Sequence, residues 1–588
     1  LALARSLIMT LRSLVLAALA ASIAVALNIN SPVDDLSSVA DGVTKAADDV
    51  VMMKGGFFPV PTTTRCIVII MCQYMIIYTA LAVCRSYHEL SETPKGKVES
   101  GLRAAAQTLT YGPMLCVLFI ACRLRVEFLS DGKDQPQMWV QRCMYFVTFS
   151  VMLSTLVVLL IPLLTGKPMP LKPGTCDLEK PTEDTADGNP NLLIALSVTR
   201  YVIMLGLYGG LAGIITGIHV YTPPGVSDVT KLPAPAPAVM CTMILAVIFF
   251  LTQIVIAAAR SYTEYTGKET AKLVGVMNGA AATVEFAPML SILFLAARMR
   301  ALQYGGQPQE WAQNAMFAST GSIAATSILA IAVPLALGGT QKTNPTSGET
   351  TFDVPDPTIG WVLLGLRYVC MACIYGGAAV VVVSIFLFES SPGVVPPISP
   401  AVSCVCNLCC QYFFVYLVLI GCLTVSEVSG GKYPLEQWKF FAAVDSTKAT
   451  LAYAPMLSVL FVTTRMYALL ITDKKGAPQA WCQDGMYMAT WSVMIAFILC
   501  LGTGAVMDKV ETDEDGNVVN KFTNKYAGIG MTAARYLAMV LLYGGIITVI
   551  VGVFSMTPET ANGRGSIPLV SDAINSTPIG NAPPSLGS

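Results

Sequence analysis

Three arginines stand inside long apolar stretches, where a charge can bind an anion or must be neutralised. Arg200, Arg367 and Arg535 each lie about eight to ten residues into such a stretch, a depth of roughly 12 to 15 Å at ~1.5 Å per residue. An isolated charge at that depth is costly, so each arginine needs a partner, a route to water or a ligand. A Tyr-Gly-Gly triplet follows each arginine on nearly the same helix face. The triplets begin at Tyr208, Tyr375 and Tyr543.

Three prolines recur in an aromatic-Gly/Ala-Pro-Met-Leu motif near the middle of another apolar stretch. Proline removes a backbone hydrogen bond and frees a carbonyl, which must find a new partner where water is scarce. One interpretation is a broken helix that lines a substrate site, and the other is a kink that helps helices pack. Glu285, three residues before its proline, could serve proton or cation coupling or could hydrogen-bond locally. The motif prolines are Pro113, Pro288 and Pro455.

A proline-glutamine-x-tryptophan-x-glutamine block introduces a further apolar stretch. Proline fits the first turn of a helix, and tryptophan fits the aromatic belt at a membrane interface. We therefore predict that the tryptophans are interface anchors. Arginines end the preceding stretch, and we expect them to snorkel to the interface or to cap the helix C-terminus. The anchors are Trp139, Trp311 and Trp481, and the arginines are Arg123, Arg298 and Arg465.

These motifs recur in one order three times, and the Tyr-Gly-Gly triplets are 167 and then 168 residues apart. A fixed period of this kind indicates a tandem repeat. Each unit has four stretches near the length that spans a bilayer, and an even number makes the copies parallel. A pseudo-threefold bundle is expected, although a row of four-helix bundles also fits. The stretches are 66–84, 104–122, 143–164, 192–218, 238–259, 279–297, 315–337, 359–387, 404–425, 448–464, 486–506 and 527–555.

A carboxylate ends the first span of each unit, on the side of the membrane where the fourth span begins. An arginine–glutamate pair within each unit is therefore one interpretation of the charged residues. The alternative is that the arginines face a shared axis or a cavity and attract an anion. The ion-pair candidates are Glu89, Glu264 and Glu427.

Composition places the chain in a membrane. Hydrophobic residues make up 54% of 588 and charged residues 12%, with a mean hydropathy of +0.63. The predicted fold is an all-α polytopic membrane protein with three parallel tandem repeats of a four-helix transmembrane unit, about 12 spans, plus an N-terminal hydrophobic helix. The predicted parts are an N-terminal helix and acidic loop (1–60), repeat units at 61–224, 225–393 and 394–556, and a polar Gly/Pro/Ser-rich tail (557–588).

Several functional classes lose support from what the sequence lacks. The net charge of −1 and the absence of a basic run argue against nucleic-acid binding. Two histidines exclude a histidine-rich metal centre, and the cysteines, most of them inside apolar runs, read as small hydrophobes. No nucleotide-binding or hydrolase motif occurs, so we expect no enzyme activity, no cofactor and no metal.

Two functions remain after these exclusions. Most chains with this many spans move a solute, so we predict a transport protein, a channel or carrier, with an anion as the candidate substrate. The alternative is a structural or scaffold protein that packs into a larger membrane assembly without transport. The expected partners are the lipid bilayer and either further copies of the chain or a larger assembly, in a membrane that the sequence does not identify.

Overall fold

The computed structural model describes the helical part of the chain. Almost all of this part is helix, with two short β-hairpins. The predicted N-terminal helix and most of the polar tail lie outside it. The described residues are 60–91, 97–129, 135–165, 190–222, 234–266, 271–304, 306–337, 340–343, 350–353, 357–390, 393–428, 439–472, 476–506, 509–512, 518–521, 525–558 and 560–561.

Within the described ranges, nine long helices correspond to the first, third and fourth predicted spans. Each has 27 to 31 residues, more than the ~20 that cross the hydrocarbon core. They are α3 (Thr62–Ser91), α6 (Met138–Thr165), α7 (Pro190–Val220), α8 (Pro237–Thr266), α11 (Glu310–Leu337), α12 (Pro357–Phe386), α13 (Pro400–Val428), α16 (Ala480–Val506) and α17 (Lys525–Phe554).

Each second span consists of two helical segments. The segments before the break are α4 (Lys97–Thr108), α9 (Ala271–Val284) and α14 (Lys439–Leu451), and a 3-10 turn, η1 (Leu109–Tyr111), follows α4. The segments after the break are α5 (Gly112–Leu129), α10 (Ala287–Gln303) and α15 (Ala454–Ile471).

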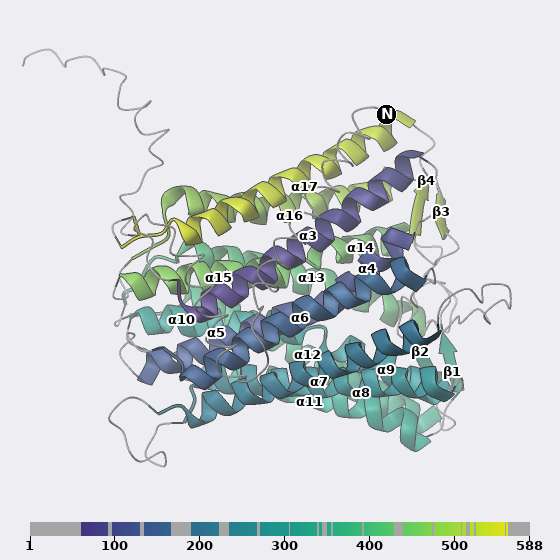
Figure 1. The fold of residues 1–588 in the computed structure, drawn as a ribbon, viewed down its shortest axis with the longest axis horizontal. Helices are drawn as coiled ribbons and strands as arrows, with labels where there is room; N and C mark the ends of the chain where they lie inside the picture. Colours follow the sequence, from purple (N-terminus) through teal and green to yellow (C-terminus); the bar gives the residue numbers. More distant parts are fainter. Residues whose placement is uncertain are drawn as a thin grey trace, which may run out of the picture.

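Two antiparallel hairpins mark one end of the molecule, here called the hairpin end (Figure 1). In the first, β1 (Thr340–Thr343) pairs with β2 (Thr350–Asp353). In the second, β3 (Lys509–Thr512) pairs with β4 (Val518–Lys521). Both lie between a third and a fourth helix, where the sequence predicts only polar loops. The opposite end holds the connections that lead into α8 and α13 and is called the linker end.

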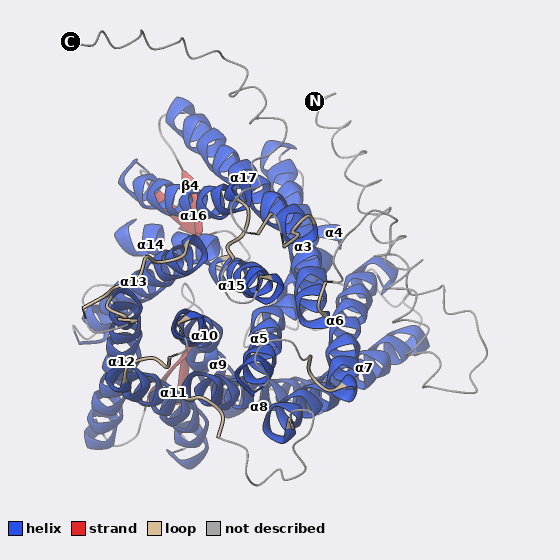
Figure 2. Cartoon of the chain, turned by 90° about the vertical axis from the view of Figure 1, so that its left-hand side faces the viewer, coloured by secondary structure: helices blue, strands red, loops and turns tan. Residues whose placement is uncertain are grey.

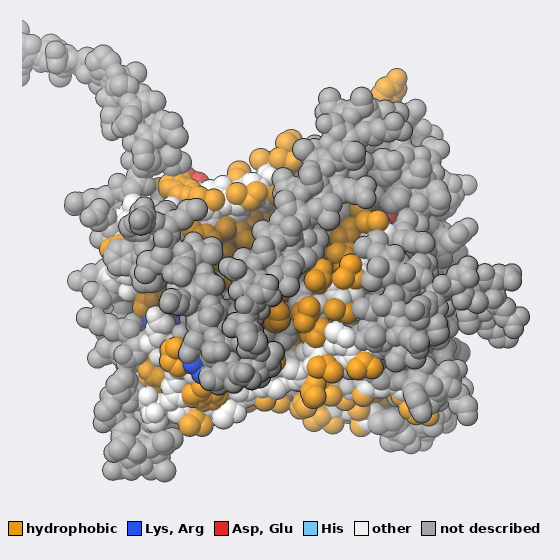
Figure 3. All heavy atoms as spheres, viewed as in Figure 1, with side chains coloured by type: hydrophobic (Ala, Val, Ile, Leu, Met, Phe, Trp, Pro, Cys, Tyr) orange, Lys and Arg blue, Asp and Glu red, His pale blue; other side chains and the backbone are white. Residues whose placement is uncertain are grey.

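In the described part of the chain, eleven helical stretches are long and apolar enough to cross a membrane, which indicates a multi-pass integral membrane protein. Figure 3 shows hydrophobic side chains over most of the visible described surface between the two ends. The predicted stretch 104–122 is not among the eleven. It is divided among α4, η1 and α5, and α5 carries Arg123, Arg125 and Glu127 near its end.

The segments after the breaks form the centre of the molecule. Figure 2 shows α5, α10 and α15 surrounded by the other long helices, and each of the three contacts the other two. Every residue in 112–127, 287–302 and 454–469 is buried. Phe119, Phe294 and Phe461 are each fully buried there. Because lipid is as apolar as these side chains, dense packing rather than water exclusion holds such a core together.

The surrounding helices close into a ring. Each central helix also contacts the first helix of the next third of the chain: α5 contacts α8, α10 contacts α13, and α15 contacts α3. The last contact joins the final third to the first. The arrangement is therefore closed around the three central helices, and the alternative of a linear row of bundles is wrong.

The third and fourth helices of each third pack closely at the Tyr-Gly-Gly triplets. A Cβ on Gly377 would lie 1.9 Å from Ser319 Oγ, and one on Gly210 would lie 2.6 Å from a Val147 methyl. By contrast, Gly376, the first glycine of its triplet, has nothing within 4 Å of such an atom. The second glycine is therefore needed for helix contact, as small residues commonly are between membrane helices.

Candidate functional site

The second spans break where the motif prolines stand. Pro113, Pro288 and Pro455 each occupy the second position of the segment after the break. Because proline has no N–H to donate to the preceding turn, one segment ends and another begins. Phe286 and Tyr453 keep right-handed helical dihedrals, and their carbonyls accept from Leu290 and Leu457. The break is thus a kink in one continuous span.

Exposure changes abruptly at this break. Three residues before the prolines, Thr110 and Ala452 are exposed, and the side chain of Glu285 is 39% exposed. The helices before the break, α4, α9 and α14, contact the first and third helices of their own third and lie toward the hairpin end (Figure 1). Beyond the break, the segments α5, α10 and α15 are buried by neighbouring helices, as described above. Most of the described residues of α4, α9 and α14 are themselves buried or half-buried, so the change in exposure is confined to the residues next to the breaks.

Tyrosines from the neighbouring third donate hydrogen bonds to the backbone carbonyls at two of the breaks. The Tyr74 hydroxyl donates to the Ala452 carbonyl at 3.0 Å, and the Tyr412 hydroxyl donates to the Glu285 carbonyl at 3.0 Å. Phe249 holds the matching place in α8 and has no hydroxyl. Two of the three breaks thus gain the partner that a polar group in a water-poor site requires.

Charge gathers at only one of the three breaks. Tyr416 donates a hydrogen bond to Glu285 Oε1, and Lys448 Nζ lies 3.5 Å from Glu285 Oε2. The Lys448 ammonium is also 5.3 Å from the centroid of the Tyr416 ring. Glu285 therefore has both a local hydrogen bond and an ion pair, while the matching Thr110 and Ala452 are uncharged.

Aromatic clusters surround the breaks and include the predicted tyrosines of the Tyr-Gly-Gly triplets. Tyr543 Oη lies 3.2 Å from Tyr453 Oη, and the Tyr375 ring is 5.9 Å from that of Phe286. The Tyr208 ring is 6.3 Å from that of Phe250, on the first helix of the next third. Each triplet tyrosine therefore lies beside a break, and Tyr208 and Tyr375 also contact the first helix of the next third.

The arginines of the fourth helices do not face the centre in the described part of the molecule. Arg367 and Arg535 are exposed on α12 and α17, two surrounding helices. The side chain of Arg200 lies outside the described part, as do those of the ion-pair candidates. Those candidates are Glu89, Glu264 and Glu427. An anion site on a shared axis therefore has no support from the described arginines.

Helix pairing gives the level of these arginines relative to the tryptophans. Gly217 of α7 lies against Val140 of α6, beside Trp139. Extending this antiparallel pairing puts Arg200 about 26 Å along the axis from Trp139 at ~1.5 Å per residue. The contacts of Gly377 with Ser319 and of Gly552 with Cys482 give about 27 Å for the other two pairs. With a hydrocarbon thickness of ~30 Å, the arginines lie near the opposite interface.

The depth expected from the sequence had a different reference. Depth was counted from the start of an apolar run, yet α7, α12 and α17 are 30 or 31 residues long. Such helices project beyond the hydrocarbon at their ends.

A second group of arginines, for which the sequence predicts snorkelling or helix capping, lies at the linker end of the central helices. Arg123, Arg298 and Arg465 are 2%, 2% and 4% exposed, so they do not snorkel. Arg298 Nη1 donates to the Gly306 carbonyl at 2.8 Å, and Arg465 Nη1 donates to the Gly476 carbonyl. Each of these two holds the loop that leads into the next helix.

Two further buried arginines tie the connections between thirds to the centre. Arg300 donates to the carbonyls of Pro396 and Pro397 at 2.7 and 3.2 Å. Arg125 donates to the Ala234 carbonyl at 3.1 Å. The sequence held a signal for this role, because one arginine follows another by two residues near the end of an apolar stretch. Residues two apart lie on different helix faces, so both arginines would not snorkel from one face.

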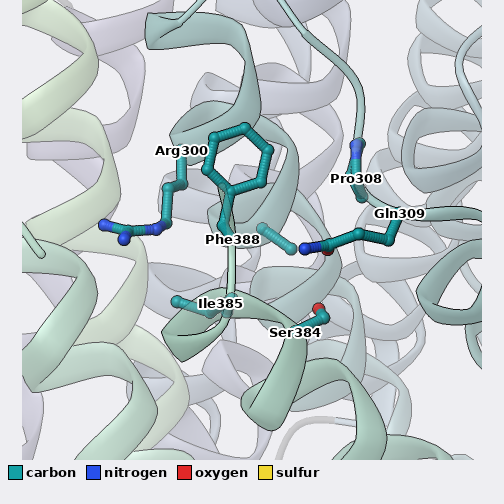
Figure 4. A pocket seen from close by; sticks show the side chains of 7 residues that line it. Arg300, Pro308, Gln309, Ser384, Ile385 and Phe388 are labelled. Atoms are coloured by element: carbon teal, nitrogen blue, oxygen red, sulfur yellow. The ribbon is translucent and has the colours of Figure 1, made fainter. Parts of the chain in front are cut away.

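A small hollow lies beside Arg300 and has no room for a water molecule. Figure 4 shows the Arg300 guanidinium pointing away from Gln309, which lines the other side with Phe388 and Ser384. The hollow is therefore a packing defect between α10 and α12 and not a binding site.

The tryptophan blocks tie the third helix to the end of the fourth. Trp139 and Trp311 are 41% and 44% exposed, while Trp481 is half-buried. Gln309 Nε2 donates to the Leu387 carbonyl at 3.1 Å, and Gln479 Nε2 donates to the Ser555 carbonyl at the same distance. The glutamines therefore have a structural role beside the predicted anchors.

Comparisons with known proteins add no further constraint. No protein-family model matches the chain, and no curated protein sequence is similar to it. Within the described residues, no group of three or more histidine, cysteine or acidic side chains is placed to hold a metal ion. The cysteines seen there are free thiols.

Proposed function

We propose that the chain is a carrier-type membrane transport protein, built from three copies of one four-span unit closed into a ring. The abrupt change in exposure at the proline breaks is the observation that carries this proposal. A set of exposed residues that stands just before a sealed segment fits a carrier in one of its two states, because alternating access needs a closed end.

In this proposal a solute enters at the hairpin end and follows α4, α9 and α14 to the breaks. There Thr110, Glu285 and Ala452 are accessible, and Glu285 with Lys448 offers charges of both signs. Beyond the breaks, α5, α10 and α15 close the way. The kinks are the hinges about which the accessible and sealed halves exchange, since broken helices absorb such changes most easily.

The proposed substrate is a small polar solute or ion whose movement is coupled to Glu285. The arginines that suggested an anion lie on outer helices, so an anion is no longer favoured over other solutes. The proposal includes no catalytic activity, no cofactor and no nucleic-acid partner.

Matching contacts support three copies of one unit. Arg200, Arg367 and Arg535 each occupy the eleventh residue of a fourth helix. Gln141 donates to the Pro136 carbonyl at 2.7 Å, and Gln313 donates to the Pro308 carbonyl at 2.6 Å. The corresponding pair in the last third also forms a hydrogen bond.

The test is flux in vesicles reconstituted with the full chain, followed with a pH-sensitive dye and a halide-sensitive dye. We expect flux above that of protein-free vesicles, and Glu285→Gln should lower it about tenfold, the effect of losing roughly 1.4 kcal/mol of binding at the break. Glu310→Gln, at an exposed carboxylate at the linker end, is the matched control and should leave flux unchanged. Flux that is insensitive to Glu285→Gln would contradict the proposed pathway.

A scaffold function is the second candidate, and the dense centre favours it. Arg125 and Arg300 hydrogen-bond to the linkers between thirds, and aromatic clusters pack across the boundaries between thirds. These contacts favour a rigid ring. If the chain is a scaffold, cross-linking in its native membrane should capture it in a larger assembly. Reconstituted vesicles would then give no flux with either dye.

A further inference from the structure

Two residues of opposite charge meet at the boundary between the second and third thirds of the chain. Glu285 stands at the break before α10, and Lys448 stands on α14, with its Nζ 3.5 Å from Glu285 Oε2. Seven residues before the other two motif prolines, at the places that match Lys448, the chain has Ala106 and Ala281. Kinks at the other boundaries form without charges at these positions, so the pair has a role other than packing.

The pair lies near the middle of the membrane. Helix α9 before the break has 14 residues and α10 after it has 17, about 21 and 25 Å at ~1.5 Å per residue. The side chains of Lys448 and Glu285 are nevertheless 43% and 39% exposed. A charge at this depth is too costly to face lipid, so it faces water or a polar ligand. The exposed sides of both groups therefore line a polar site in mid-membrane.

Aromatic rings complete the surroundings of the Lys448 ammonium. Its Nζ is 5.3 Å from the centroid of the Tyr416 ring, and the Tyr416 hydroxyl donates to Glu285 Oε1. The Tyr416 ring lies 4.6 Å from that of Tyr412 and 5.0 Å from that of Phe286. A carboxylate beside the face of an aromatic ring is an arrangement that binds ammonium groups. Lys448 thus shows, with its own side chain, which contacts an ammonium makes at this boundary.

The same break also leaves a hydroxyl unsatisfied. Within the described residues, the buried Tyr375 Oη makes no hydrogen bond. The matching Tyr543 Oη lies 3.2 Å from Tyr453 Oη. Beside Tyr375, Phe286 stands in the place of Tyr453 and has no hydroxyl. A buried polar group without a partner is costly, and a polar ligand at this break would satisfy it.

We propose that this boundary is a binding site for a protonated primary amine, and that the Lys448 ammonium takes the place of the ligand in the state described. The Glu285 carboxylate binds the ammonium of the ligand through a charge-assisted hydrogen bond, and the face of the Tyr416 ring meets its positive charge. One cation replaces another, so the carboxylate stays neutralised in mid-membrane. As the substrate site of a carrier, this inference rests on the proposed function and names its substrate class.

The experiment is chemical rescue of the purified full chain in neutral detergent, with thermal unfolding as the readout. Lys448→Ala removes the tethered ammonium from Glu285 and should lower the melting temperature. Propylammonium, which replaces the lost part of the side chain, should raise it again by about 1–2 °C at tenfold its dissociation constant. Sodium chloride at equal ionic strength should not. The wild type should respond less, because Lys448 competes for the site.

The matched control is the double variant Lys448→Ala with Glu285→Gln, which lacks the carboxylate and should show no rescue. Equal responses of the single and double variants, or no response of either, would overturn the amine site whatever the flux. If Lys448→Ala does not fold, the shift of the wild type against that of Glu285→Gln decides, and equal shifts would again overturn the site.

Uptake of radiolabelled ethanolamine separates this inference from the proposed function. Vesicles that contain the wild-type chain should take up more than protein-free vesicles, and Glu285→Gln should lower the uptake about tenfold. Rescue together with uptake supports both proposals. Rescue without uptake supports the amine site and contradicts the carrier function, so the two failures are distinguishable.

Discussion

The two halves of the second spans differ in what surrounds them, although both are helical and both are joined at a proline. Before the break, α4, α9 and α14 pack mainly on the first and third helices of their own third and are followed by the exposed residues Thr110 and Ala452. After the break, α5, α10 and α15 touch one another and bury every residue for about four turns. One kink per span thus separates a segment with exposed residues beside the break from a fully buried one.

This difference separates two tasks that share one segment. The sealed half holds the molecule together, and its residues are constrained on all sides by neighbouring helices. The half before the break has exposed residues next to the break, so their side chains are available for other roles. Substitutions in the two halves should therefore have very different effects.

The largest difference is expected in chemical accessibility. Thr110→Cys and Ala452→Cys should react with a membrane-impermeant maleimide in reconstituted vesicles, whereas Ser291→Cys and Ser458→Cys, both at fully buried positions, should not. Peptide mapping by mass spectrometry separates these sites from the native thiols. Equal labelling of all four positions would remove the distinction between the two halves.

A large difference in stability is expected next. Phe294→Ala, at a fully buried position on α10, should lower the free energy of unfolding by about 3–5 kcal/mol through loss of packing and a cavity. Thr110→Ala, in the accessible half, should change it by less than about 0.5 kcal/mol. Denaturation by sodium dodecyl sulfate in mixed micelles measures both, and similar values would count against a sealed core.

The connection between the last two thirds depends on the same core. Arg300→Met removes the hydrogen bonds to Pro396 and Pro397 and should cost about 1.5–3 kcal/mol, because the bonds involve a charged group. Protease cleavage of the native protein between residues 393 and 399 should become faster. Arg535→Met, at an exposed position, is the control that should leave the cleavage rate unchanged.

The smallest effect is expected at the boundary between the halves. Tyr412→Phe removes the donor to the Glu285 carbonyl and reproduces the residue type of Phe249, so it should cost about 0.5–1.5 kcal/mol. Unfolding in mixed micelles again gives the value. Phe249→Tyr is the reverse test. If it destabilises the protein as much as Tyr412→Phe does, the hydrogen bond from the tyrosine hydroxyl to the carbonyl is unimportant for stability.

Much of the fold could be predicted from the recurring motifs. The motif prolines stand at the second-span breaks, the glutamine-tryptophan blocks begin the third helices, and the triplet glycines mark the contact with the fourth. These predictions succeed because proline, glycine and tryptophan act through local backbone or interface chemistry. Local chemistry can be read from one segment of sequence.

The position of each helix in the ring could not be predicted in the same way. Arg123 and Arg298 were expected to snorkel or to cap the helix C-terminus, yet both are buried, because the second spans form the centre. Hydropathy does not distinguish a central helix from a peripheral one when lipid and protein interior are equally apolar. The depth of the fourth-helix arginines stays a prediction for a related reason, since an apolar run does not show where the bilayer ends.

The contact that joins α15 to α3 also has a consequence for chain connectivity. Val60, before α3, and Ala561, after α17, belong to one buried cluster with Tyr467, and Ala477 N–H donates to the Ala561 carbonyl at 2.7 Å. The two ends of the described chain are therefore neighbours at the linker end. We therefore expect a circular permutant that joins residue 561 to residue 60 to keep the contact between α15 and α3, so that the ring can be built from a different starting point.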